Sequence, residues 1–287
     1  MRAACIARRV ACAMAACAAA AMSQPNVAAW DVLKRGLSET YIEKRKQAVL
    51  AVGTIGPAPQ VIDLLNLALR DKDVQVRQTA AAEIADARMR QCIPNLTAAL
   101  DDTGEVAFTA AKALWDMGDR SGRSIFDEVV TRELKDSPGF IQGAIRDAKA
   151  KLHDPRGLVK MGAMEASGAL LGPFSMGIIV AQDMLKDTGA PTRAFALITL
   201  SQDCDPKGAQ LMGWALDNDK NNMVRAAAAK ALGRCGNVAT IDKLMRLLAE
   251  NSDAVRYMAA ASVVRLTIER VPRTAATPTS PQPSSPP

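Results

Sequence analysis

Few side chains in this sequence could take part in catalysis or hold a metal ion. His153 is the single histidine among 287 residues, and it stands in the run Leu152-His153-Asp154-Pro155. One histidine cannot form a histidine-rich metal site, and no cysteine or carboxylate cluster has the spacing of zinc ligands. Neither a glycine-rich phosphate loop nor a GxSxG motif occurs. The sequence therefore predicts no catalytic, cofactor-binding or metal-binding residues.

The dominant feature of the sequence is a pattern that recurs about every thirty residues. In each copy, alanine lies three residues after a reference residue and an aliphatic residue lies seven after it. A period of this length is typical of solenoids, in which copies of one small unit stack on one another. The six reference residues are Arg45, Arg77, Ala107, Arg193, Arg225 and Arg256.

Each copy is expected to contain two helices. We call the helix that carries the alanine pattern, as in 74–87 and 223–233, the patterned helix. The other helix of the pair, as in 59–71 and 206–218, we call the companion helix; its apolar residues at i, i+3, i+6 and i+7 predict an amphipathic helix. Aromatic residues make up only 3% of the chain, which argues against an all-β fold. The prediction is an all-α fold, a solenoid of about seven to eight antiparallel helix pairs over residues 22–270.

Three of the patterned stretches share a more specific motif. They are 74–87 (VQVRQTAAAEIADA), 223–233 (MVRAAAAKALG) and 254–266 (AVRYMAAASVVRL). They resemble HEAT repeats, in particular the bacterial type grouped with phycobilisome-lyase HEAT-like repeats, which is marked by D-x-x-V-R-x-x-A-A-x-A-L-G. The resemblance covers about residues 30–120 and 191–270, and its motif is specific for architecture rather than for function.

The resemblance implies a ladder of polar contacts between neighbouring repeats. Ala107 and the Lys44-Arg45 start depart from the motif, so we expect the ladder to be interrupted. The residues to which this structural role is carried over are Asp73, Arg77, Asn221, Arg225, Asp253 and Arg256.

Two kinds of enzyme fall within the resemblance. Deoxyhypusine hydroxylases hold iron with paired His-Glu motifs, and this sequence has none. Phycobilin lyases attach a bilin, a role that the signal-like N-terminus and the scarcity of aromatic residues do not suit. The resemblance therefore implies no cofactor for this chain.

The first 21 residues have the pattern of a secretory signal. Arg2, Arg8 and Arg9 precede an uncharged stretch over residues 10–21, which ends in Ala19-Ala20-Ala21. A positive start, a short apolar region and small residues at the cleavage site define such signals. The apolar region is too short for a transmembrane helix. We expect export to the bacterial periplasm or beyond the cell.

Two other interpretations of this segment stay open. Met14-Ala15-Ala16-Cys17 resembles a bacterial lipobox, in which Cys17 would be lipidated and would anchor the protein to a membrane. The third interpretation is an uncleaved segment or a misassigned start. Contact with a membrane is expected only through the signal or a lipid anchor.

Cysteine does not settle the compartment. Cys92, Cys204 and Cys235 remain outside the signal, with no CxxC spacing. Cys204 and Cys235 are one repeat apart, so neighbouring units could bring them together as a disulfide in an oxidising compartment. The alternative is that all three are small buried apolar side chains.

The formal net charge of +6 is weak support for nucleic-acid binding. Half of it comes from the three arginines of the signal segment, and no dense block of Lys and Arg follows. The densest cluster, Lys44-Arg45-Lys46, lies inside a predicted patterned helix. These observations argue against a nucleic-acid partner.

Two regions depart from the repeats. The middle, 121–190, is an irregular part of the solenoid, in which 139–152 and 155–169 are expected helices. The tail, 271–287, is rich in Pro, Ser and Thr and is expected to be disordered.

The most consistent function is a non-catalytic scaffold that binds a protein partner. The alternative is an enzyme or cofactor-handling protein with its site in the irregular middle, a phycobilin-lyase-like role among them. A third possibility is a structural component of a cell-envelope assembly. We expect solvent-facing residues of the companion helices to line the concave side of the solenoid. The candidates for binding the partner are Asp63, Asn66, Asn95, Lys243 and Arg246.

Overall fold

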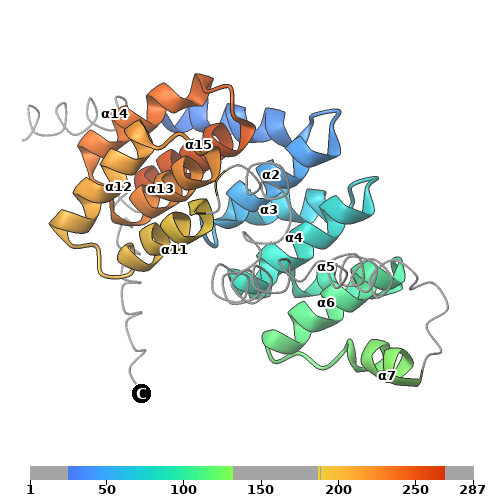
Figure 1. The fold of residues 1–287 in the computed structure, drawn as a ribbon. Helices are drawn as coiled ribbons and strands as arrows, with labels where there is room; N and C mark the ends of the chain where they lie inside the picture. The colour runs from blue at the N-terminus through green and yellow to red at the C-terminus, as the bar shows by residue number, and fades with distance from the viewer. Residues whose placement is uncertain (1–24, 132–186, 188, 269–287) are drawn as a thin grey trace, which may run out of the picture.

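The computed structural model describes residues 25–131, 187 and 189–268, and the regular structure within these ranges is helical (Figure 1). The predicted all-α solenoid is confirmed for this part of the chain. Several sequence-based predictions fall wholly or mostly outside it: the signal segment 1–21, the irregular middle 121–190, the tail 271–287, His153 and Cys17.

The N-terminal half contains three helix pairs and one further helix. A companion helix over residues 25–37 opens the half. Its third companion helix is short and lies between two turns of 3-10 helix, where the sequence predicted one continuous helix. After residues 25–37 the elements are α2 (Ile42–Gly53), α3 (Pro59–Ala68), α4 (Val74–Asp86), α5 (Ile93–Ala98) with turns Arg90–Cys92 and Ala99–Asp101, α6 (Gly104–Asp116) and α7 (Arg123–Thr131).

The C-terminal half repeats the same arrangement. A patterned helix comes first in the described residues and is followed by two complete pairs. The elements are α11 (Ala190–Leu200), α12 (Pro206–Asn218), α13 (Asn222–Cys235), α14 (Val238–Arg246) with a 3-10 turn Leu247–Ala249, and α15 (Asp253–Ile268). None of the helices in the described ranges combines the length and the hydropathy that a membrane span requires.

The alanine pattern marks where patterned helices touch. The alanines three residues after the reference are fully buried in α2, α4, α6, α13 and α15. Alanine lets two helix backbones approach closely, and the aliphatic residue one turn later fills the remaining space. Helix α11 differs, because its Ala196 is exposed and Ala194 and Leu197 are buried instead. Among the described helices α11 packs on α13 and α12 alone, so it buries only the face that meets them.

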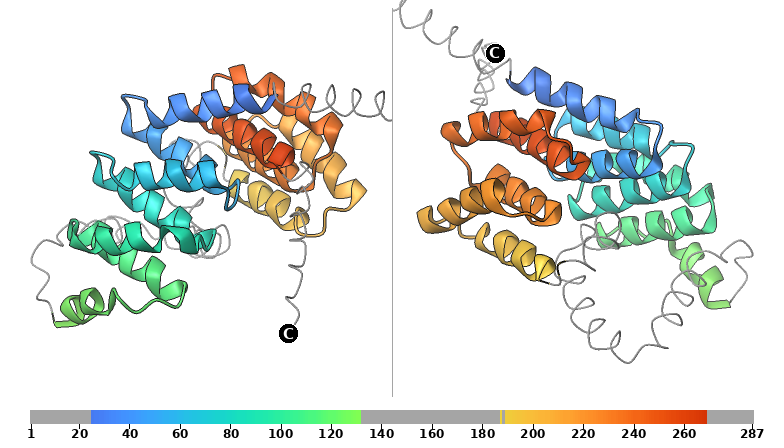
Figure 2. Two further views of the ribbon diagram at one scale, coloured as in Figure 1. Left: turned by 180° about the vertical axis from the view of Figure 1, so that it is seen from behind. Right: turned by 45° about the horizontal axis from the view of Figure 1, so that its top comes forward.

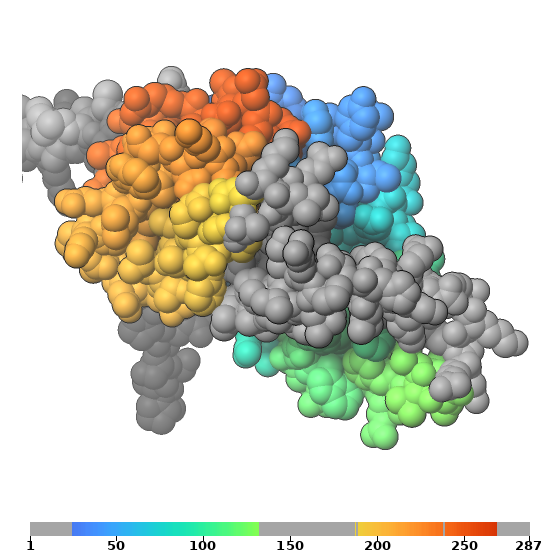
Figure 3. Space-filling model, viewed as in Figure 1, coloured from blue at the N-terminus to red at the C-terminus, as the bar shows by residue number. Residues whose placement is uncertain are grey.

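The two halves join through the two ends of the repeat array. Patterned helices pack on one another in the spatial order α11, α13, α15, α2, α4, α6, so the last helix of the chain's repeats meets the first patterned helix. Figures 2 and 3 show the red C-terminal helices beside the blue N-terminal ones. Helices α7 and α11, which are nearer in sequence, lie at opposite ends of this order.

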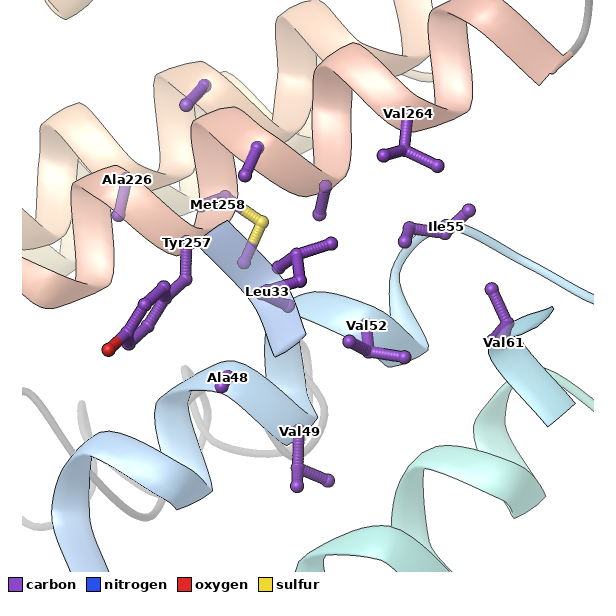
Figure 4. Close-up of a cluster of buried hydrophobic side chains, with 14 of the residues drawn as sticks. Leu33, Ala48, Val49, Val52, Ile55, Val61, Ala226, Tyr257, Met258 and Val264 are labelled. Carbon is purple, nitrogen blue, oxygen red and sulfur yellow. The ribbon is translucent and has the colours of Figure 1, made fainter. Parts of the chain in front are cut away.

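The contact between α15 and α2 is apolar at its centre and polar at its ends. Tyr257 and Met258 of α15 are buried with Leu33 and Ala48 of the first helix pair (Figure 4). Apolar area buried in this way contributes roughly 25 cal/mol per Å².

Polar contacts flank this apolar junction on both sides. Asn26 donates from Nδ2 to Thr267 Oγ1 at 3.0 Å, and Arg265 donates to the Thr54 carbonyl at 3.1 Å. These bonds fix the register of α15 on the first helix pair. The described halves therefore form one continuous core.

The helices form two layers. Successive patterned helices pack directly together, whereas among the described elements no two successive companion helices make a comparable contact. The closely spaced layer of a curved array is its inner layer, so the patterned helices form the inner side and the companion helices the outer side. Our expectation that companion helices line the concave side is therefore wrong.

Candidate functional site

A ladder of arginine–carboxylate pairs links neighbouring repeats. In the N-terminal half, Arg45 Nε lies 2.8 Å from Asp71 Oδ2, and Arg77 Nε lies 2.6 Å from Asp102 Oδ2. Both arginines use two nitrogens, the geometry in which guanidinium and carboxylate bind most strongly. Burial opposes the ionisation of Asp102, but its bonds to Arg77 and Thr103 outweigh this and lower its pKa.

The C-terminal half repeats these rungs. Arg193 Nε lies 2.8 Å from Asp219 Oδ2, and Arg225 lies 2.5 Å from Glu250 Oε2. Each acid stands 25 or 26 residues after its arginine. That constant spacing is a signal in the sequence that could have identified the acceptors.

The acceptors differ from the residues that the resemblance implied. Asp73 and Asn221 cap the N-termini of α4 and α13 by accepting from backbone N–H groups of their own helices. Arg256 bonds Asp253 within its own helix and the Glu250 carbonyl, so this pair does not join two repeats. The ladder also includes Arg45, where an interruption was expected.

The five candidate partner-binding residues lie on the outer layer. Asp63 and Arg246 are exposed, and Asn66 is half-buried. Arg70 donates to Asn95 Oδ1 at 3.4 Å, and Lys243 lies 2.5 Å from Asp217 Oδ2. Only Lys243 and Arg246 share one helix, α14, so the structure does not bring the five together.

An exposed apolar pair lies beside Lys243. Leu211 and Trp214 of α12 are one turn apart, with exposed fractions of 46% and 62%. Lys243 reaches over α12 to within 3.6 Å of where a Cβ on Gly213 would stand. We call Leu211, Trp214, Asp217, Lys243 and Arg246 the outer patch. Sequence reasoning missed Leu211 and Trp214, although they fall outside the buried stripe of their helix.

A buried carboxyl group lies on the inner side of the N-terminal half. Glu83 of α4 is 6% exposed and rests against Gly53, where a Cβ would lie 2.0 Å from Glu83 Oε2. Burial raises the pKa of Glu83 to about 8, with a further rise from Asp86, while Lys230 of α13 acts in the opposite direction. Alanine, serine or threonine occupies the equivalent position of the other patterned helices, so Glu83 is the exception in its row.

Burial likewise governs Lys230, the partner of Glu83 across the array. It lowers the pKa of Lys230, whereas Glu83 and Asp86 favour the charged ammonium. This coupling joins α4 to α13, which are separated by α15 and α2 in the order of packing.

Cys204 and Cys235 form a disulfide, which joins the end of α11 to the end of α13. Cys92 is buried and free. Within the described ranges, no group of three or more His, Cys, Asp or Glu side chains could hold a metal ion. The enzymatic alternative concerned the irregular middle, most of which is outside these ranges.

Comparison with known proteins agrees with this architecture. Residues 180–265 match the family model of HEAT repeats. No curated protein matches the sequence. Human deoxyhypusine hydroxylase, solved in complex with glycerol, is 17% identical, and the alignment covers 84% of this chain and 97% of that one with a TM-score of 0.33.

An engineered protein is 19% identical, with 83% of this chain and 97% of that one covered and a TM-score of 0.25. Similarity at this level says nothing about activity. The helix-pair architecture and the family match identify this chain as an α-solenoid of HEAT repeats.

Proposed function

We propose that this protein is a non-catalytic scaffold that binds a partner protein through the outer patch. The exposure of Trp214 on α12 is the observation that carries the proposal. Tryptophan and arginine dominate the binding energy of protein interfaces, because they bury a large apolar area while keeping polar contacts. In the outer patch, Leu211 and Trp214 are flanked by the Lys243–Asp217 ion pair and by Arg246.

The proposed site of action is outside the bacterial cytoplasm, in the periplasm, beyond the cell or on a membrane through lipidated Cys17. The signal-like first 21 residues support export. The Cys204–Cys235 disulfide supports it independently, since structural disulfides persist mainly in oxidising compartments. Cell fractionation with and without globomycin separates the alternatives, because only a lipoprotein precursor accumulates under the drug.

A photo-cross-linking amino acid at position 214 tests the outer patch in cells. Position 67 is the matched control, since Leu67 is an equally exposed leucine (64%) on the companion helix α3 of the other half. We expect a discrete cross-linked protein from position 214 and none from position 67.

With the cross-linked protein purified, Trp214→Ala should weaken its binding by roughly tenfold or more, as at interface hot spots. Leu67→Ala should leave the affinity unchanged. The same cross-links from both positions, or equal affinities of the two variants, would remove the outer patch from the proposal.

A further inference from the structure

A small pocket lies between the C-terminal parts of four patterned helices. Its volume is about 80 Å³. Three basic and three hydroxyl side chains line it, contributed by α11, α13, α15 and the end of α2. They are Lys230, Arg234, Arg265, Thr54, Ser201 and Ser262.

The repeat itself generates this convergence. Lys230 and Arg234 stand five and nine residues after Arg225, so they are one turn apart on the same face of α13. Arg265 stands nine residues after Arg256, and Thr54 nine after Arg45. Equivalent positions of stacked helices meet in a row, and here the row crosses the junction between the two halves.

The hydroxyl groups are already committed as donors. Ser201 donates to the Ile198 carbonyl at 2.7 Å, Ser262 to the Ala229 carbonyl at 2.8 Å, and Thr54 to the Ala51 carbonyl at 2.7 Å. The groups at the pocket that can donate to a ligand are therefore the three basic side chains. Arg265 gives one of its N–H groups to the Thr54 carbonyl and has others to offer.

We propose that Lys230, Arg234 and Arg265 bind one small oxyanion, a phosphate or a carboxylate group, in this pocket. The volume admits a group of a few heavy atoms and excludes a nucleotide or other cofactor, whose sites typically occupy about 300–1,000 Å³. Helix C-termini carry roughly half a negative charge each, which three full positive charges outweigh.

The surroundings of Lys230 support an anion. Burial lowers its pKa, and the acids that oppose this effect are Glu83 and Asp86 of α4. The carboxyl group of Glu83 has a raised pKa because it is buried, so it supplies less negative charge at neutral pH than an exposed acid would. A bound oxyanion would offset the remaining cost of the buried ammonium group.

Calorimetric titration of the full chain tests the site. Inorganic phosphate and acetate are titrated separately at one ionic strength, balanced with sodium chloride. Arg234→Glu is the main variant, because Arg234 is exposed and its replacement leaves the core intact. Arg246→Glu is the matched control, an exposed arginine near the end of α14.

We expect saturable binding of one ion per chain by the unmodified protein and by Arg246→Glu. Arg234→Glu should bind at least about tenfold more weakly, as for the loss of a charged hydrogen bond, and Arg234→Lys should recover part of the affinity. Saturation by phosphate alone or acetate alone assigns the source of the oxyanion. Saturation by neither ion, or equal weakening in Arg234→Glu and Arg246→Glu, would overturn the proposal.

Discussion

At the scale of single residues, position within the unit decides what a side chain does. The reference arginines each reach an acid in the next unit, whereas the capping Asp73 and Asn221 act within their own helices. Gly53 and Gly233 are small for a related reason. A Cβ at Gly53 would meet Glu83, and one at Gly233 would lie 2.6 Å from Ser262 Cβ of the next patterned helix. These glycines permit close packing, where the sequence alone indicated helix ends.

The pH dependence of stability should report on Glu83. Its pKa in the folded protein is raised from 4.5 to about 8 by burial, so the protonated form favours folding. This contribution is complete below about pH 4.5 and is lost as the pH rises toward 8. Relative to Glu83→Gln, we expect the unmodified protein to lose roughly 2–4 kcal/mol of unfolding free energy over that range.

Urea denaturation of both proteins at a series of pH values measures this difference. Glu43→Gln is the control, because the Glu43 side chain is 59% exposed. It should follow the unmodified protein at every pH. A constant difference between Glu83→Gln and the unmodified protein would contradict the buried environment of this carboxyl group.

At the scale of elements, the helix pair is stabilised by covalent as well as by packing interactions. The Cys204–Cys235 disulfide closes a loop of 31 residues that contains the whole companion helix α12. Cross-linking restricts the unfolded chain and holds α11, α12 and α13 together. The disulfide thus supports the helix that presents Trp214.

Removal of this disulfide should lower the free energy of unfolding by about 2–4 kcal/mol. The comparison is between the unmodified protein and the double variant Cys204→Ser with Cys235→Ser, each with and without dithiothreitol. The reductant should destabilise the first protein and leave the second unchanged. An unmodified protein insensitive to reductant would show that the bond contributes nothing to the stability of this unit.

At the scale of the whole molecule, the order of packing differs from the order of the chain. Helix α15 completes the C-terminal half and at the same time continues into the N-terminal half through α2. Gly36 lies at this junction, where a Cβ would stand 2.7 Å from Tyr257 Cε1 and 2.8 Å from Ala48 Cβ. The junction therefore depends on a residue without a side chain.

Gly36→Ala should destabilise the protein by about 1–3 kcal/mol, as overpacking of a core does, although alanine favours helices. Gly213→Ala is the matched control: its nearest neighbour lies at 3.6 Å, so the helix preference should stabilise the protein by about 0.5–1 kcal/mol. Thermal unfolding measures both changes. Hydrogen exchange should locate faster opening at α2 and α15 in Gly36→Ala, and unchanged exchange there would contradict the proposed role of the junction.

The sequence by itself determined the repeat, the helix class and most helix limits. The predicted companion helix 206–218 matches α12, and predicted 74–87 is within one residue of α4. These features are local, because alanine spacing, capping residues and amphipathic stripes act over one or two helical turns. The pairing of helices within a unit follows from short connections for the same reason.

Only the tertiary structure decided which helices face inward, which acids receive the arginines, and where the array closes. The junction of α15 with α2 brings together residues more than 200 positions apart, such as Thr54 and Arg265. No periodic pattern encodes such a contact, since every unit has nearly the same packing face and could stack on any other. The inner pocket follows from that closure: its basic groups belong to separate repeats, and the curvature of the assembled layer alone brings them to one place.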